Sequence, residues 1–181
     1  AIEIAAALAF GTGHHGTTAG CLLALDAELK KRRPRHGIDI GTGTGILGLA
    51  LAKQIKRKVV AGDIDAVAVE VSAHNARLNH APNALDLYVA PGLRHAKANR
   101  PGHFDFVFAN ILAGPLKRLA PSIARVLSSN GTLILSGLLA MDVAGVVSAY
   151  RHQGVYLTSH SLREGWATLV MKKGGAAPRP R

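Results

Sequence analysis

A glycine-rich turn between two apolar segments constrains the fold more than any other part of this sequence. The stretch "HGIDIGTGTGILGLALAKQIK" (36–56) begins with a run typical of a buried strand and continues into a segment whose apolar residues recur at helical spacing. Gly41, Gly43 and Gly45 stand between the two, and glycine readily adopts the backbone conformation that a tight turn requires. The pattern predicts a strand over 36–40, a turn, and a helix over 46–56, which is half of a βαβ unit.

The same alternation continues along the chain. Further strands are predicted at 58–63, 85–90, 104–110 and 132–137, and helices at 18–34, 66–81, 115–131 and 140–154. Asn130 and Gly131 are expected to cap the helix over 115–131. The last two strands, 155–161 and 166–173, are joined by too few residues for a helical crossover, so they should pair antiparallel. The expected fold is α/β, with a doubly wound, mostly parallel seven-stranded sheet and an antiparallel C-terminal hairpin.

Composition bounds the class of protein. The 181 residues, 48% of them hydrophobic, are enough for one domain with a sizeable core. No membrane-spanning helix is expected, because polar residues interrupt every apolar run before the roughly 20 residues that a span needs. Cys21 is the only cysteine, which excludes an intramolecular disulfide and a zinc site built on several thiolates, and fits a cytoplasmic location. The sequence has no initial Met, so we expect upstream residues to be missing, and residues 174–181 are expected to be a disordered tail.

The charge balance leaves two interpretations open. Lys and Arg number 22 against 11 Asp and Glu, which gives a formal net charge of +11. Such an excess favours contact with nucleic acid, ribosomal particles or other anionic surfaces. Much of it lies in 30–36, 53–58 and the C-terminal tail, which are expected helix ends or termini, where cations also complement the helix dipole. An ordinary solvated surface therefore explains the charge equally well.

Ligands of doubly wound sheets bind beyond the carboxyl ends of the strands, where Gly41, Asp63 and Asn110 are expected. Two ligands compete for "DIGTGTGILG". Read from Gly43, the glycines match the dinucleotide fingerprint, with Asp63 about 20 residues further on as the acid that binds a ribose. Read from Gly41, they form D-x-G-x-G-x-G, in which Asp39 attracts the ammonium of S-adenosylmethionine while Gly41 and Gly43 admit its methionine part.

The acid before the glycines favours S-adenosylmethionine, because an aminocarboxylate carries an ammonium group and a pyrophosphate does not. The antiparallel C-terminal hairpin favours it too, since this edge is typical of class I methyltransferases and atypical of dehydrogenase nucleotide domains. Asp63 would then accept hydrogen bonds from both ribose hydroxyls. A helix N-cap is its alternative role, although Asp65 is the better candidate for that cap.

Five segments, in order and over nearly the whole chain, resemble the PrmA family of methyltransferases: "AFGTGHHGTT", "DIGTGTGILGLA", "GDIDAVAVEVSAHNA", "FANILAGPL" and "LILSGLL". The resemblance implies a class I, Rossmann-like catalytic domain over 1–173, with Thr18, Gly41, Asp63 and Asn110 at cofactor-binding positions. It also implies a substrate in the large ribosomal subunit, a stalk protein methylated on lysine side chains and its N-terminal amine. The family carries an N-terminal recognition domain for that substrate, and we expect residues 1–181 not to contain it.

Two features depart from the family pattern. His14-His15-Gly16 stands where the family commonly has Thr-His-Pro, which leaves the role of His14 open. The loop "APGLRHAKA" has no acid to bind the adenine amine, so backbone groups are expected to do so. A metal site at His14 and His15 is not expected, because adjacent side chains diverge and no carboxylate or cysteine lies at ligand spacing.

Methyl transfer to an amine needs a neutral nucleophile held in line with the methyl group. We expect the side-chain carbonyl of Asn110 to orient that amine, with turn formation as its alternative role. Without the recognition domain, the chain should bind the cofactor and methylate slowly or not at all. A methyltransferase of RNA or of another protein and a non-catalytic cofactor-binding module are the alternatives. The main hypothesis requires neither nucleic acid nor a membrane.

Overall fold

The computed structural model describes Glu3 and residues 15–175. Its elements are, in chain order, α1 (His15–Leu29), β1 (Gly37–Ile40), α2 (Ile46–Ile55), β2 (Val59–Asp63), α3 (Ala66–Leu78), β3 (Leu85–Val89), β4 (Phe104–Asn110), α4 (Ala113–Val126), β5 (Leu127–Leu139), the short 3-10 helix η1 (Ala140–Asp142), α5 (Val143–Arg151), β6 (Val155–Arg163) and β7 (Trp166–Lys173). The strands form one sheet in the order β3-β2-β1-β4-β5-β7-β6. β1 to β5 run parallel and β7 pairs antiparallel with β5 and β6, which confirms the predicted fold.

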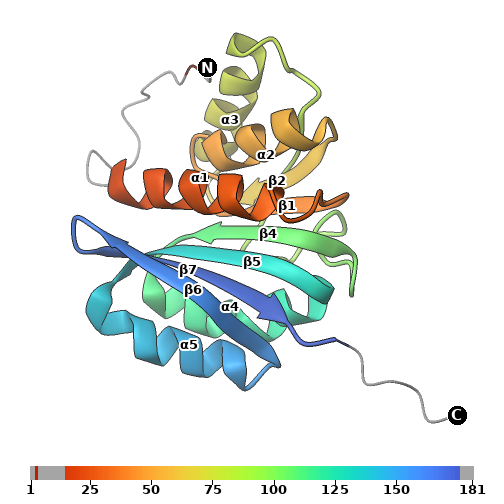
Figure 1. The fold of residues 1–181 in the computed structure, drawn as a ribbon. Coiled ribbons are helices and arrows are strands. Elements are labelled where there is room, and N and C mark those ends of the chain that lie inside the picture. Colours follow the sequence, from red (N-terminus) through yellow and green to blue (C-terminus); the bar gives the residue numbers. More distant parts are fainter. Residues whose placement is uncertain (1–2, 4–14, 176–181) are drawn as a thin grey trace, which may run out of the picture.

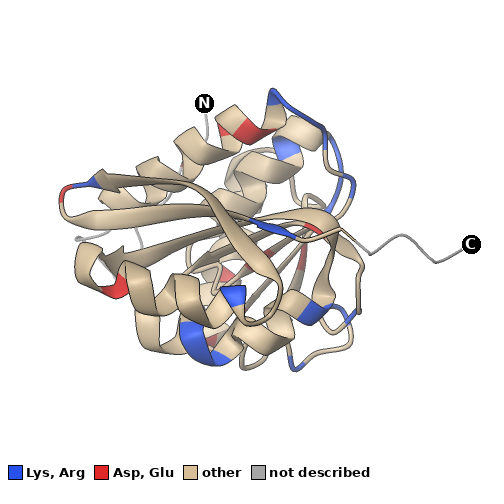
Figure 2. Ribbon diagram, turned by 60° about the horizontal axis from the view of Figure 1, so that its bottom comes forward, with Lys and Arg blue, Asp and Glu red and all other residues tan. Residues whose placement is uncertain are grey.

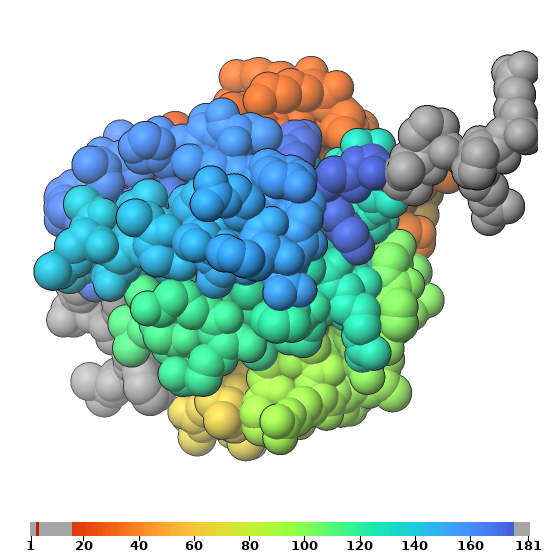
Figure 3. Space-filling model, turned by 90° about the horizontal axis from the view of Figure 1, so that it is seen from below, coloured from red at the N-terminus to blue at the C-terminus, as the bar shows by residue number. Residues whose placement is uncertain are grey.

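Helices cover both faces of the sheet. α1, α2 and α3 lie on one face, and α4 and α5 lie on the other (Figure 1). Figure 3 views the second face, where residues of α4 and α5 form much of the surface. Side chains alternate along β4, so Phe106 and Phe108 pack with the first helix layer while Val107 and Ala109 pack with the second. Burial on both faces explains why the central strands read as nearly continuous apolar runs.

The boundary between α4 and β5 differs from the prediction. The helix was expected to run to residue 131 with Asn130 and Gly131 as its cap, but it ends at Val126 and β5 begins at Leu127. Leu127 is fully buried and pairs with Phe104 of β4. The register then shifts, because the next pair is Thr132 of β5 with Phe106 of β4. Asn130 keeps the positive φ typical of a helix cap, 59°, but in a bulge of β5. Burial of Leu127 against the sheet therefore decides where the helix ends.

The bounds of the first helix and the extent of the ordered C-terminal end also differ from the predictions. α1 begins at His15 and ends at Leu29, five residues before Pro34. The amide of Gly174 donates to the carbonyl of Gly154 at 2.9 Å, so the chain is still held to the sheet at this point. Residues 176–181 lie outside the described residues. None of the described helices is long and apolar enough to cross a membrane.

Candidate active site

The glycine loop (residues 41–45) joins β1 to α2 at the carboxyl edge of the sheet. The amides of Gly41 and Thr42 both donate to the carbonyl of Gly62 in β2, at 2.9 and 3.0 Å, which holds the loop against the neighbouring strand. Gly41, Gly43 and Gly45 have φ values of 69°, 55° and 81°. A Cβ at Gly41 would lie 2.4 Å from the Ile111 side chain, whereas a Cβ at Gly43 would meet nothing within 4 Å. The backbone of Gly43 therefore borders open space that a ligand can reach.

The carboxylate of Asp63, the last residue of β2, lies beside this open space. The amide of Gly43 donates to Asp63 Oδ2 at 3.0 Å, and the amide of Asp65 donates to Oδ1 at 3.1 Å. Asp65 is the N-cap of α3, because its Oδ1 accepts from the amide of Val67 at 2.9 Å. The capping alternative for Asp63 is thereby excluded, and its carboxylate is fixed against the glycine loop.

Asp39 lies beneath the loop rather than beside the open space. Its side chain is 1% exposed, and its Oδ2 accepts hydrogen bonds from the Thr42 hydroxyl at 2.8 Å and the Gly48 amide at 3.0 Å. Burial raises the pKa of Asp39 from 3.8 to about 6; the hydrogen bonds from Thr42 and Gly48 oppose this rise, and the negative charge of Asp63 adds to it. The expected attraction for a ligand ammonium must therefore act through the loop and not by direct contact.

Asn110 ends β4 next to the glycine loop, because Ala109 pairs with Ile40 in β1. Its Nδ2 donates to Thr17 Oγ1 in the first turn of α1 at 3.3 Å. Its Oδ1 is buried and accepts no hydrogen bond from the described residues. An unpaired buried acceptor costs about 1–3 kcal/mol, so this oxygen is suited to accept a hydrogen bond from a ligand.

Thr17 is a candidate site residue that was not predicted from the sequence. It is fully buried, whereas Thr18, the residue expected at the site from the resemblance, is partly exposed. Successive helical residues point about 100° apart, so the two hydroxyls face in different directions. The structure thus brings Asp39, Gly41, Gly43, Asp63 and Asn110 to one edge of the sheet, and it joins Thr17 rather than Thr18 to Asn110 by a hydrogen bond. His14 and the side chain of His15 lie outside the described part of the chain.

The loop after β3 closes the same edge of the sheet. The ring of Tyr88 lies on the backbone of Gly62, where a Cβ would come within 2.0 Å of the ring. The Tyr88 hydroxyl donates to the carbonyl of Gly92 at 2.8 Å. The Tyr88 ring stacks on the His95 ring, with 5.1 Å between the ring centroids. These contacts fix the start of the loop beside the end of β2.

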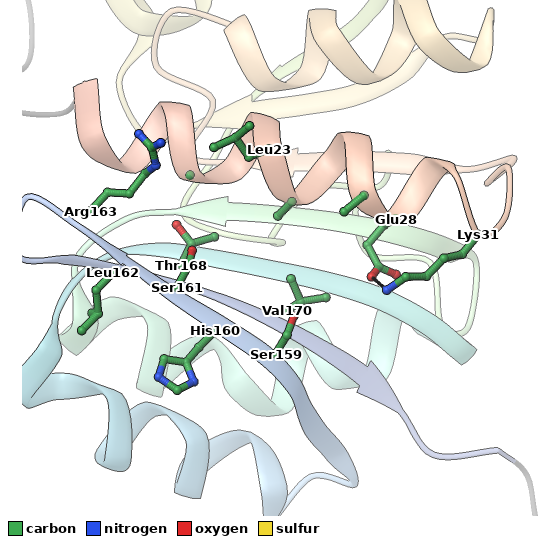
Figure 4. Close-up of a pocket in the computed structure, with 13 residues that line it drawn as sticks. Leu23, Glu28, Lys31, Ser159, His160, Ser161, Leu162, Arg163, Thr168 and Val170 are labelled. Atoms are coloured by element: carbon green, nitrogen blue, oxygen red, sulfur yellow. Dashed lines mark hydrogen bonds and ion pairs between the residues drawn. The ribbon is translucent and has the colours of Figure 1, made fainter.

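A separate groove lies away from these residues, between α1 and the β6–β7 hairpin (Figure 4). It has a volume of about 310 Å³, and Glu28 and Lys31 lie at one end of it. Glu28 pairs with Lys31 at 2.6 Å and with Lys172 at 3.0 Å. Burial raises the pKa of Glu28, but the hydrogen bonds from the two lysines outweigh this effect and leave the pKa lowered. None of the predicted site residues lines this groove.

Comparison with known proteins finds one matching family model and several close relatives of this chain. The family model described as ribosomal protein L11 methyltransferase (PrmA) matches residues 1–174. The ribosomal protein L11 methyltransferase of Bradyrhizobium diazoefficiens is 49% identical over 96% of this chain and 59% of its own length. That of Mesorhizobium japonicum is 47% identical, over 95% and 59%. The chain thus spans about three fifths of the length of the curated relatives it matches.

Solved structures show the same similarity. A ribosomal protein L11 methylase from Lactobacillus delbrueckii subsp. bulgaricus superposes with a TM-score of 0.81 and 26% identity, over 90% of this chain and 81% of that one. A precorrin-6y C5,15-methyltransferase from Geobacter metallireducens has a TM-score of 0.70 at 15% identity, over 91% of this chain and 93% of that one, and so shows a shared fold alone.

Proposed function

We propose, since this chain belongs to the PrmA family of ribosomal protein L11 methyltransferases, that it transfers methyl groups from S-adenosylmethionine to lysine side chains and the N-terminal amine of ribosomal protein L11. The observation that carries the proposal is the unpaired, buried carbonyl oxygen of Asn110 at the same sheet edge as the open backbone of Gly43 and the carboxylate of Asp63. At this edge, the Asn110 oxygen can accept a hydrogen bond from an amine, and the space beside Gly43 and Asp63 can hold a nucleoside.

The site residues fit the cofactor. Each oxygen of Asp63 accepts one backbone amide, and a carboxylate has about four acceptor positions, so two remain for the ribose hydroxyls. Gly43 leaves room for the methionine part, while Gly41 makes the turn against the Ile111 side chain. We assign Thr18 a cofactor contact because of its place in the family motif. When bound, S-adenosylmethionine supplies an electrophilic methyl group on a sulfonium.

Asn110 orients the incoming amine in this proposal. Because Thr17 Oγ1 engages the Nδ2 of Asn110, the amide presents its carbonyl oxygen, and not its NH₂ group, to the substrate. A lysine with an ordinary pKa near 10.4 is almost fully protonated at neutral pH, so desolvation must lower that pKa. Leu112 and Met141, 62% and 84% exposed near the ends of β4 and β5, offer apolar contacts to the lysine methylenes. Thr17 is a positioning residue and Asn110 a catalytic one.

Single-turnover methylation tests these roles. The chain, in excess over labelled S-adenosylmethionine and concentrated enough to bind all of it, is mixed with excess L11, or with ribosomal RNA in a parallel reaction. We expect slow incorporation of label into L11 and none into RNA. Asn110→Ala should lower the rate by about 100-fold or more, as the loss of one preorganised polar group does elsewhere, while cofactor affinity changes little. Thr17→Val should lower the rate by about tenfold, because a misplaced group still accepts a hydrogen bond.

The control is Thr158→Val. This variant removes another hydroxyl, one that donates to the carbonyl of Val170 in the hairpin, and it should leave the rate unchanged. An unchanged rate in Asn110→Ala with cofactor still bound would contradict the role of Asn110. Label in RNA and none in L11 would contradict the substrate.

A further inference from the structure

The edge of the sheet opposite the candidate active site is strongly basic, and we propose that it binds single-stranded RNA through the phosphate backbone. This basic edge is defined by six exposed side chains in four segments: Arg33, Arg35, Arg57, Lys58, Arg100 and Arg125. In Figure 2, blue segments gather on the side where the C-terminus is marked, which is the side where the parallel strands begin.

Strand register brings these segments together. Ile38 in β1 pairs with both Val60 in β2 and Val107 in β4, so the segments that precede these three parallel strands lie side by side. The amide of Asp105 donates to the carbonyl of His36 at 3.0 Å, which ties the segment before β4 to the one before β1. The amide of Gly102 donates to the carbonyl of Arg125 at 2.9 Å, which adds the end of α4. One continuous strip of cations results.

The acids near this edge leave the cations available. The carboxylate of Asp105 accepts the backbone amides of Arg35 and His36, each at 2.9 Å, and its ion-pair partner is Arg32, at 3.8 Å, which is not one of the six cations. Glu28 is buried and paired with two lysines. Within residues 15–175, no ion pair involves the side chains of the basic edge. Helix dipoles do not account for the whole strip, because Arg35 lies six residues beyond the end of α1 and Arg100 lies in the loop before β4.

Two features favour RNA over an anionic membrane. Proteins that lie on membranes bury apolar anchors, but most of the large apolar side chains that are exposed around the sheet ends lie at the opposite, carboxyl edge, namely Ile64, Val67, Val89, Leu112, Leu139 and Met141. Tyr156, at the start of β6, is the exception and lies at the amino edge. The basic edge instead carries two imidazole rings, His36 and His103, with centroids 4.3 Å apart. Such rings are platforms on which unpaired bases stack.

Fluorescence anisotropy with a labelled 20-nucleotide RNA of mixed sequence tests the proposal. The choice of RNA over DNA rests on the proposed ribosomal substrate, and the assay contains neither cofactor nor L11, so it can fail without affecting the proposed methylation. The logarithm of affinity should fall with the logarithm of salt concentration by about 0.7 for each phosphate contact. Arg35→Glu/Arg57→Glu/Lys58→Glu should weaken binding by about tenfold or more at moderate salt and reduce that slope by roughly 2.

The matched control is Lys117→Glu/Arg118→Glu/Arg163→Glu. It makes the same change in net charge with three exposed cations of α4 and the hairpin, and its affinity for RNA should stay within about threefold of the parent. Arg35→Ala/Arg57→Ala/Lys58→Ala should also weaken binding, and this variant replaces the charge-reversed one if charge reversal prevents folding.

Three results would overturn the proposal. Equal losses of affinity in the two charge-reversed variants would mean that net charge alone acts. Equal or tighter binding to duplex DNA of the same length would contradict the assignment to single-stranded RNA. Binding to phosphatidylserine vesicles that survives at salt concentrations at which RNA is released would identify a membrane as the partner.

Discussion

Replacing Asp39 with Asn should raise the free energy of unfolding, and this gain should increase with pH. Burial raises the pKa of Asp39 from 3.8 to about 6 in the folded protein, while the unfolded chain keeps the ordinary value. Between these values the folded protein holds a proton that the unfolded chain has released, so the free energy of unfolding falls as pH rises. Above pH 6 both states are ionised, and the full cost, about 3 kcal/mol, persists. Asn keeps the shape and an oxygen that can accept the hydrogen bonds from Thr42 and Gly48.

Urea unfolding of the parent and of Asp39→Asn at several pH values measures this effect. The free energy of unfolding of the variant minus that of the parent should increase by about 2 kcal/mol between pH 4.5 and 7.5 and level off above pH 7. Other groups contribute to both proteins and cancel in the difference. Glu164→Gln, which removes one negative charge from the exposed hairpin turn, controls for net charge. A difference that stays constant over this pH range would refute the argument from burial.

Two further predictions concern packing near the site. Gly62→Ala should lower the free energy of unfolding by about 1–3 kcal/mol in urea, because the new Cβ would lie 2.0 Å from the ring of Tyr88; an unchanged midpoint would mean that the ring can move aside. Cys21 is buried, and burial raises the pKa of its thiol, so modification by a thiol reagent at pH 8 should be at least about 100-fold slower in the native protein than in urea. Equal rates would show that this part of α1 opens readily.

The fold was predictable because its signals are local. Strand and helix periods alternate along the chain, and a mostly parallel sheet covered by helices accommodates that alternation. The error at the end of α4 has a non-local cause. Leu127 fits the helical period as well as a strand, and Asn130-Gly131 is typical of a helix cap. The pairing of Leu127 with Phe104, 23 positions earlier, decides between the two, and no local pattern encodes it.

Part of the site was likewise predictable from the sequence, and part depends on contacts between residues far apart in it. Gly43 and Asp63 meet because the ends of neighbouring parallel strands must meet, which is a rule of the fold. The choice between Thr17 and Thr18 depends instead on how α1 is rotated about its axis. A Cβ at Gly20 would lie 2.2 Å from the Thr168 hydroxyl, so α1 approaches β7 closely only with residue 20 facing the sheet. Residues three apart share a helix face, so that rotation also turns Thr17 inward, towards Asn110. The glycine three residues after Thr17 is therefore the signal in the sequence that favours Thr17 as the partner of Asn110.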